Sequence, residues 1–211
     1  MLVSKSVAII DYGMGNIGSV LNALKYLDQD ARIIARPENA ADCQALIVPG
    51  VGSFGDCSSH LSKNGFTELI KEWVSSGKPI MGICLGLQIL FETSEESENI
   101  SGLSIFKGTV KRFNHTHNLK VPQIGWNKLH IQNSDCPMFK GIQNESYFYL
   151  VHSFYVDPAD EAIIAGKTNY GLEYCSCLWS DNVFATQFHP EKSQKIGLKM
   201  LQNFCDWSIN V

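Results

Sequence analysis

The groups in this sequence that could do chemistry are a cysteine between two glycines and, downstream, a histidine followed by an acid. Residues 82–86 (GICLG) join an apolar run to a helical pattern. Glycines beside the central residue allow a strained turn that exposes its side chain. Backbone N–H groups at the start of the next helix favour a thiolate and can hold an oxyanion. Cys84 is therefore a candidate nucleophile; the alternative is a buried structural cysteine.

His189 and Glu191 are the candidate base and its orienting acid, in residues 187–191 (QFHPE). Residues two apart lie on the same side of an extended chain, and we expect Pro190 to keep this link extended. A histidine so placed can serve as general base and acid. By itself the segment could be an ordinary surface turn. Together with Cys84 it has the logic of a nucleophilic triad.

Two glycine-rich turns follow apolar runs. Residues 49–52 (PGVG) end the run 45–48, and a turn there can aim a backbone N–H across the carboxyl edge of a sheet, which favours an oxyanion-hole role. Residues 13–18 (GMGNIG) match the dinucleotide fingerprint, which makes an oxidoreductase an alternative. Asp11 and Tyr12 separate that loop from its strand, and Glu38 follows Pro37 rather than ending a strand, so we disfavour dinucleotide binding.

Neither a metal nor a cofactor is expected. His115 and His117, taken with Cys175 and Cys177, do not have the spacing of common zinc sites. His152 lies in a strand-like run, and we expect it to be a structural histidine.

The elements that must position these groups alternate in the first half of the chain. Apolar runs at 7–10, 32–35, 45–48 and 79–83 are separated by helical stripes at 17–27 and 66–74, and another helix starts at 85. This order implies parallel strands with crossover helices. Strand-like segments at 108–113, 127–131, 147–156, 162–167, 173–179 and 183–188 follow, then a helix from about 193. We predict one α/β domain over residues 1–211, with a mixed, largely parallel sheet flanked by helices and extended by antiparallel strands.

Composition excludes several classes of protein. The 211 residues carry a net charge of −4 and no basic run, which argues against a nucleic-acid partner. No stretch without Asp, Glu, Lys or Arg is longer than the 13 residues of 43–55 or 79–91, which falls short of the roughly 20 residues of a membrane helix. Seven cysteines with no C-x-x-C pair, and no secretory signal pattern, favour reduced thiols and a cytoplasmic protein.

The motifs together resemble a known family. Residues 49–52, 82–88 (GICLGLQ) and 187–193 (QFHPEKS) resemble the class I, triad-type glutamine amidotransferases. Residues 11–16 (DYGMGN), 121–127 (VPQIGWN) and 149–153 (YLVHS) are similar to the glutaminase subunits of imidazole glycerol phosphate synthase. The resemblance runs over residues 9–193, and it implies an enzyme with the fold predicted above.

The resemblance also implies roles for individual residues. Cys84 would attack the glutamine carboxamide, His189 would transfer protons and Glu191 would orient it. N–H groups near Val51 and Gly52 and at Leu85 would face the oxyanion. Four positions match residues that hold glutamine: Gln88, Glu96, Ser153 and Phe154. The intact Cys84, His189 and Glu191 argue against a non-catalytic scaffold.

A partner is implied in the same way. Ammonia would pass into a (β/α)₈-barrel cyclase in a heterodimer that makes imidazole glycerol phosphate and an aminoimidazole carboxamide ribotide for histidine biosynthesis. Asn16, Trp126, Tyr149 and Lys192 match positions at that interface. Gln123 stands where the family usually has His. This departure leaves open a paralogue that feeds ammonia to a sugar-modifying synthase.

Overall fold

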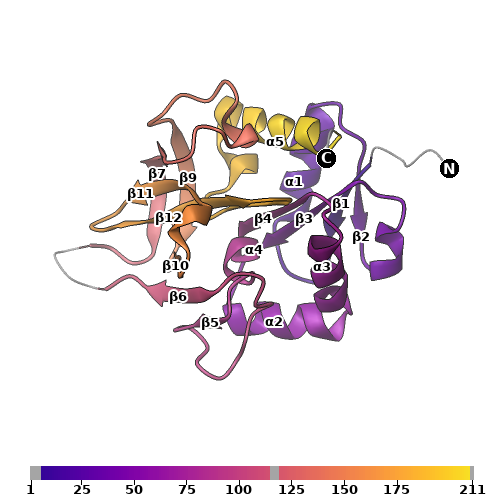
Figure 1. The fold of residues 1–211 in the computed structure, drawn as a ribbon, viewed down its shortest axis with the longest axis horizontal. Helices are drawn as coiled ribbons and strands as arrows, with labels where there is room; N and C mark the ends of the chain where they lie inside the picture. The colour runs from indigo at the N-terminus through magenta and orange to yellow at the C-terminus, as the bar shows by residue number, and fades with distance from the viewer. Residues whose placement is uncertain (1–5, 115–118, 210–211) are drawn as a thin grey trace.

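A mixed sheet runs through the protein, as the computed structural model in Figure 1 shows, and within the described residues it has eleven strands. The structure describes residues 6–114 and 119–209. Five strands are parallel, in the order β2-β1-β3-β4-β13. Their bounds are β1 (Val7–Ile10), β2 (Ala31–Ile34), β3 (Ala45–Gly50), β4 (Ile80–Cys84) and β13 (Val183–Thr186). The predicted alternation of strands and crossover helices is confirmed.

Antiparallel strands extend this sheet beyond β13, as predicted. The order continues β12-β10-β6, with β5 parallel to β6 at the edge, while β11 pairs with β12 and with β8. Their bounds are β5 (Thr93–Ser94), β6 (Gly108–Arg112), β8 (His130–Ile131), β10 (Phe154–Pro158), β11 (Ile164–Asn169) and β12 (Glu173–Ser180). A separate two-stranded sheet pairs β7 (Gln123–Lys128) with β9 (Tyr147–His152).

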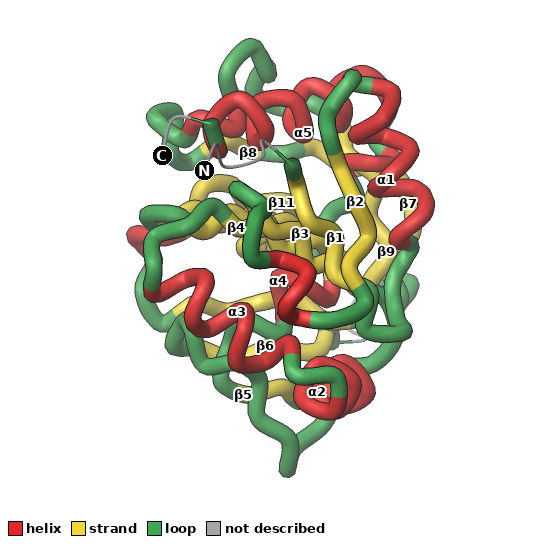
Figure 2. Tube along the Cα trace, turned by 90° about the vertical axis from the view of Figure 1, so that its right-hand side faces the viewer, coloured by secondary structure: helices red, strands yellow, loops and turns green. Residues whose placement is uncertain are grey.

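Helices cover both faces of the parallel strands (Figures 1 and 2). One layer holds α1 and α5, and the other holds α2, α3 and α4. The helices are α1 (Ile17–Tyr26), α2 (Phe54–Lys63), α3 (Phe66–Ser75), α4 (Leu85–Gln88) and α5 (Gln194–Ser208). Short 3₁₀ turns are η1 (Pro37–Ala40), η2 (Pro137–Phe139), η3 (Glu161–Ile163) and η4 (Pro190–Lys192).

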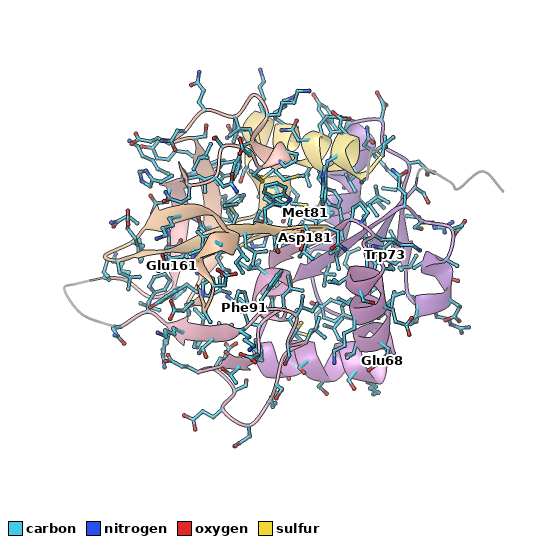
Figure 3. All side chains as sticks on the ribbon, in the orientation of Figure 1. Glu68, Trp73, Met81, Phe91, Glu161 and Asp181 are labelled. Carbon is cyan, nitrogen blue, oxygen red and sulfur yellow. The ribbon has the colours of Figure 1, made fainter. Side chains whose placement is uncertain are left out.

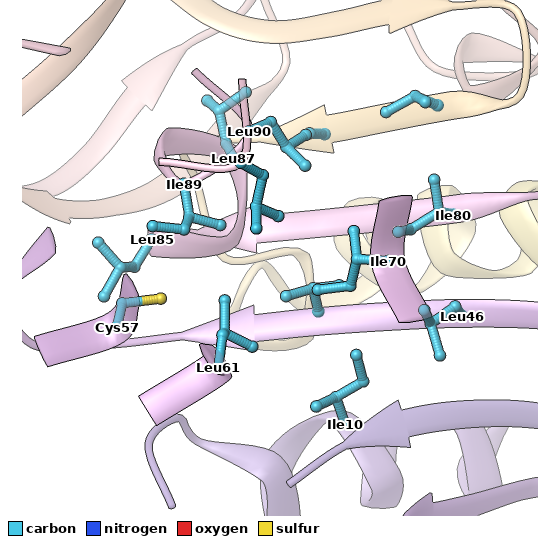
Figure 4. Close-up of a cluster of buried hydrophobic side chains, with 14 of the residues drawn as sticks. Ile10, Leu46, Cys57, Leu61, Ile70, Ile80, Leu85, Leu87, Ile89 and Leu90 are labelled. Carbon is cyan, nitrogen blue, oxygen red and sulfur yellow. The ribbon is translucent and has the colours of Figure 1, made fainter. Parts of the chain in front are cut away.

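Residues of the parallel strands alternate between the two layers. On β1, Ile9 packs toward α1 and α5, whereas Ile10 packs toward α2 and α3. In Figure 4, Ile10, Leu46 and Ile80 of the strands lie with apolar side chains of the helices. The labelled Met81 and Phe91 in Figure 3 belong to opposite layers. Burial on both faces explains why these strands are short uninterrupted apolar runs.

Several predicted boundaries were wrong. Helix α2 was not predicted, because its sequence FGDCSSHLSK carries few apolar residues; Ser53 caps it by accepting a hydrogen bond from the Asp56 N–H. The helix expected to start at 85 does so, but it ends after one turn at Gln88. The run 147–156 is broken at Ser153 into β9 and β10, which belong to different sheets. The strand expected at 127–131 is the end of β7 followed by β8.

Candidate active site

Cys84 ends β4 and directly precedes α4, with φ 56° and ψ −107°. The left-handed φ is strained for a residue with a side chain. The two glycines beside it are required by close backbone approach: a Cβ on Gly82 would lie 2.5 Å from the Gly86 carbonyl oxygen, and one on Gly86 would lie 1.9 Å from that of Val48. The G-x-C-x-G motif thus lets α4 start directly over β3 and β4, with Cys84 at the turn.

His189 and Glu191 are hydrogen-bonded to each other, 2.8 Å from Nδ1 to Oε1, and both side chains are almost fully buried. A carboxylate only accepts, so Nδ1 carries the proton and Nε2 of the neutral ring is left as a base. The backbone conformation between the two residues differs from the extended one that was expected. Residues Pro190–Lys192 make a 3₁₀ turn, so the prediction of an extended link at Pro190 was wrong.

The surroundings of His189 favour its charged form. Burial alone would lower the pKa of the imidazole, but Cys84 and Glu191 outweigh burial and raise that pKa to about 10. Nε2 has no hydrogen-bond partner within the described residues, although the atom is buried. The site therefore stabilises the imidazolium that forms when the neutral ring takes a proton on Nε2.

One cavity of about 380 Å³ brings the predicted site residues together. Cys84 and His189 line it, and so do the seven residues predicted for the oxyanion and for glutamine: Val51, Gly52, Leu85, Gln88, Glu96, Ser153 and Phe154. The sequence did not indicate the other lining residues, Pro122, Val151 and His152, as parts of a site. The volume lies in the usual range for small-molecule sites.

The 49–52 segment lies beside the cysteine because β3 pairs with β4, and Gly50 is opposite Cys84. Gly52 has φ +109°, which favours glycine. The Tyr12 hydroxyl donates to the Pro49 carbonyl at 2.9 Å, and a Cβ on Gly15 would lie 3.4 Å from the same oxygen. Gly15 of the loop with the dinucleotide-like glycines therefore packs against Pro49 of the predicted oxyanion segment, which gives this glycine a structural role.

Two of the residues predicted to bind the substrate, Glu96 and Gln88, form hydrogen bonds within the protein through one side-chain atom each. Glu96 Oε2 accepts from the N–H of Phe54, the first residue of α2, at 2.7 Å. Gln88 Nε2 donates to the Phe154 carbonyl at 3.1 Å and to Gln187 Oε1 at 3.0 Å. Gln187 in turn donates to Cys84 Sγ at 3.6 Å. The sequence interpretation gave Gln187 no role, although it is the first residue of the 187–193 motif that contains His189.

His152 is a buried, hydrogen-bonded histidine, as predicted. Nδ1 is 2.7 Å from the Phe154 carbonyl, Nε2 is 3.2 Å from the Tyr174 hydroxyl, and burial lowers its pKa to about 4. Gln123 is bonded to the same Tyr174 hydroxyl and is 3% exposed. The unusual residue at 123 is therefore in the interior and does not face a partner.

The four predicted interface residues lie on elements that contact one another in series. Asn16 precedes α1, which contacts η4, where Lys192 lies. The turn η4 contacts β9, on which Tyr149 pairs with Trp126 of β7. The rings of Trp126 and Tyr149 meet edge to face with centroids 6.1 Å apart. These four residues therefore lie on neighbouring elements, of which η4 directly follows His189.

Cys175 and Cys177 are buried on β12, while His115 and His117 lie outside the described residues. Across residues 6–114 and 119–209, no cluster of three or more His, Cys, Asp or Glu side chains could hold a metal ion. Nor does any helix in these ranges have the length and apolarity needed to cross a membrane.

Sequence comparison identifies the family. The profile of the class-I glutamine amidotransferases matches residues 8–207. The HisH subunits of imidazole glycerol phosphate synthase from Syntrophotalea carbinolica and Methanocaldococcus jannaschii are 46% and 48% identical to this chain. These matches cover 95% of this chain in both cases, and 99% and 98% of the relatives.

Structural comparison agrees on the fold. A chain of the PurLQS structure from Thermotoga maritima has a TM-score of 0.77 at 19% identity, covering 96% of this chain and 98% of that one. A crystal structure of a glutamine amidotransferase has a TM-score of 0.75 at 17% sequence identity, with the same coverage of both chains. The chain is an enzyme of the class-I glutamine amidotransferase family, and within it belongs with the HisH subunits of imidazole glycerol phosphate synthase.

Proposed function

We propose that this chain hydrolyses L-glutamine to glutamate and passes the ammonia to the cyclase subunit of imidazole glycerol phosphate synthase. One observation carries the chemical part of the proposal. Cys84 and His189 line the same cavity, and the hydrogen bond from His189 to Glu191 leaves Nε2 as the basic nitrogen. The high identity to HisH subunits supports the choice of reaction and of partner.

The first half of the reaction forms a thioester. His189 Nε2 takes the proton of the Cys84 thiol, and the thiolate attacks the carboxamide carbon of glutamine. The tetrahedral intermediate carries a negative oxygen, which the N–H groups near Val51 and Gly52 and that of Leu85 stabilise. When the C–N bond breaks, His189 returns its proton to the leaving nitrogen, and ammonia departs.

The second half hydrolyses the thioester. His189 Nε2 removes a proton from water, and the resulting hydroxide attacks the thioester carbon. The C–S bond breaks, and glutamate and the free Cys84 thiolate are regenerated. Glu191 stabilises the imidazolium in both halves without taking its proton.

Residues across the cavity hold the amino-acid end of glutamine. Glu96 supplies a negative carboxylate for the α-ammonium group, and Phe54 N–H fixes its position through Oε2. Gln88 lies on α4, one turn after the nucleophile. Ser153 and Phe154, at the junction of β9 and β10, line the same cavity.

The cyclase partner would bind at the surface around β7 and β9. Ile124, Trp126 and Tyr147 on these strands are 63%, 44% and 53% exposed, which is unusual for large apolar side chains on one small sheet. Asn16 and Lys192 add polar groups beside this surface.

All seven cysteines are free thiols, which suits a reducing compartment and supports the cytoplasm as the location of the protein.

The test is to assay the purified chain with the cyclase and its nucleotide substrate, following glutamate release and formation of imidazole glycerol phosphate. The proposal expects both products from the wild-type chain and neither from Cys84→Ser with glutamine. Glutamate without the cyclase product would favour a sugar-modifying partner. That alternative depended on Gln123, which is bonded to Tyr174 in the interior, so this position does not favour it.

A further inference from the structure

We propose that Gln187 is a positioning residue that holds the Cys84 sulfur as a hydrogen-bond acceptor and fixes the Gln88 amide beside it. The inference rests on the proposed role of Cys84 as the nucleophile. It concerns a residue that neither the fold nor the triad geometry requires to be polar. A single buried amide would serve both the attacking atom and a substrate-binding side chain.

Gln187 is placed rigidly. It directly follows β13 and is completely buried. Its backbone N–H donates to the Ser176 carbonyl of β12 at 2.8 Å. Its side chain reaches across to the nucleophile elbow, where Nε2 is 3.6 Å from Cys84 Sγ and Oε1 is 3.0 Å from Gln88 Nε2. A buried amide without partners would be destabilising, so both of these bonds matter.

Hydrogen-bond chemistry fixes the direction of every bond in this chain of groups. The Phe154 carbonyl can only accept, so the Gln88 atom 3.1 Å from it must be the NH₂ group. That same nitrogen lies 3.0 Å from Gln187, so the Gln187 atom there must be the carbonyl oxygen. The remaining end of Gln187, which faces Cys84, is then its NH₂ group. The Phe154 carbonyl thus determines that sulfur meets a donor.

A donor aimed at sulfur favours the thiolate over the thiol. Hydrogen bonds to charged groups are about twice as strong as neutral ones, so the Gln187 N–H interacts more strongly with the anion. The bond also fixes the position of the sulfur from the Gln187 side, and His189 lines the same cavity as Cys84. Gln187 and the imidazolium together would hold the thiolate ready for attack.

The other end of Gln187 acts on substrate binding through Gln88. The Gln88 NH₂ group donates to two acceptors, Phe154 O and Gln187 Oε1. Its two hydrogens are thereby used, and Gln88 can meet glutamine only through its oxygen. Loss of Gln187 would free the Gln88 amide to rotate, which would weaken glutamine binding.

Alkylation of Cys84 by iodoacetamide tests this inference without relying on turnover. The full chain in complex with its cyclase is alkylated at pH 6 to 9. The rate is obtained from the fraction of the Cys84 peptide that carries the added mass at each time. We expect Gln187→Met to slow alkylation at pH 7 about tenfold and to move the pH of half-maximal rate upward by about one unit, since a bond to a charged group is lost. With glutamine, kcat should fall and KM should rise.

Two control variants separate the contributions. Gln88→Met removes the group that orients the Gln187 amide but keeps the amide itself, so it should raise KM and slow alkylation less than Gln187→Met does. Asn203→Leu removes a buried amide of α5 that donates to the Met138 and Lys140 carbonyls, away from the site. It should lower stability and leave both alkylation and kcat unchanged. If Gln187→Met does not fold, Gln187→Glu replaces it, because its carboxylate places negative charge beside the sulfur and should slow alkylation at pH 8 at least as much.

The inference would be overturned if a folded Gln187 variant were alkylated at the wild-type rate at every pH. It would also be overturned if the changes in alkylation rate and kcat were no larger than those of Asn203→Leu. Failure of the proposed function looks different: the wild-type chain would then release no glutamate, or Cys84→Ser would release it at the wild-type rate.

Discussion

The backbone N–H of His189 donates a hydrogen bond to the Tyr149 carbonyl, 2.9 Å away. Ser193 strengthens this connection: its hydroxyl accepts from the Tyr149 N–H at 3.0 Å and donates to the His189 carbonyl at 2.6 Å. The proposed catalytic base is thereby attached to β9, the strand whose neighbour β7 carries Trp126. A partner that moves the β7–β9 sheet would move the base with it.

We predict that Trp126→Ala weakens binding of the cyclase by about 10- to 100-fold, because exposed tryptophans at the centre of an interface often contribute most of its free energy. Calorimetric titration of the two subunits measures the change. Tyr26→Ala is the matched control, since Tyr26 is 77% exposed at the opposite end of α1 from Asn16. Equal affinities for the two variants would contradict a partner surface on β7 and β9.

Glu191→Gln should impair glutaminase less than His189→Ala. Glu191 orients and stabilises the imidazole through the 2.8 Å bond, whereas His189 itself carries the proton. The measurement is single-turnover formation of the thioester with each variant in the complex. Equal losses in the two variants would mean that Glu191 takes a direct part in proton transfer.

The chain alone should hydrolyse glutamine slowly and become active with the cyclase and its nucleotide. The oxyanion segment contains Gly52 at φ +109°, and glycine-flanked peptides can reverse their N–H direction with little strain. One missing oxyanion donor lowers the rate by about 100- to 1,000-fold. Steady-state glutaminase with and without the loaded cyclase tests this, and full activity of the lone chain would exclude such a switch.

Gly52→Ala should lower the glutaminase rate of the loaded complex more than it weakens glutamine binding. An alanine is strained at this φ, and its Cβ would lie 2.6 Å from the present position of Met14 Cε. Gly77→Ala is the control, because Gly77 also has a positive φ but a Cβ there meets no atom within 4 Å. Comparable kcat values for both variants would place the oxyanion donors elsewhere.

The protein should lose stability as the pH falls below about 6.5, in part through His152. Burial lowers its pKa in the folded state to about 4, so between these values only the unfolded chain binds the proton. Stability is then complete above the unfolded pKa and decreases by up to about 3 kcal/mol toward pH 4. Urea unfolding at pH 4 to 7 should show a smaller decrease in the free energy of unfolding for His152→Gln than for the wild type. Identical slopes for His152→Gln and wild type would contradict this.

The parallel half of the fold could be predicted because its strands are buried on both faces and are therefore plain apolar runs. Helix α2 could not, since half of its surface faces solvent and its start depends on Ser53 and on Glu96, which is distant in sequence. The division of 147–156 into two sheets is equally invisible, because Tyr147–His152 and Phe154–Pro158 have similar sequences but different partners.

Cys84 could be predicted from a motif with strong local constraints, whereas Gln88, Glu96, Ser153 and Phe154 were expected only from the family resemblance. The glycines beside Cys84 must be glycines, because a side chain there would overlap backbone atoms of Gly86 and Val48. His152 was predicted only as a structural histidine and Gln187 was given no role, because no sequence spacing reveals their contacts with Gln88, Phe154 and Tyr174. The contact of His189 with Glu191 was expected, but through the wrong backbone geometry.

The most direct test of the central claim is Cys84→Ala in the complex with the cyclase, assayed with glutamine and separately with ammonia. Cys84 is needed only to release ammonia, so glutamine-dependent formation of the cyclase product should fall at least about 100-fold. Ammonia-dependent formation should stay close to the wild-type rate, because that chemistry belongs to the other chain. Glutamine-dependent synthesis that survives the substitution would mean that another group is the nucleophile.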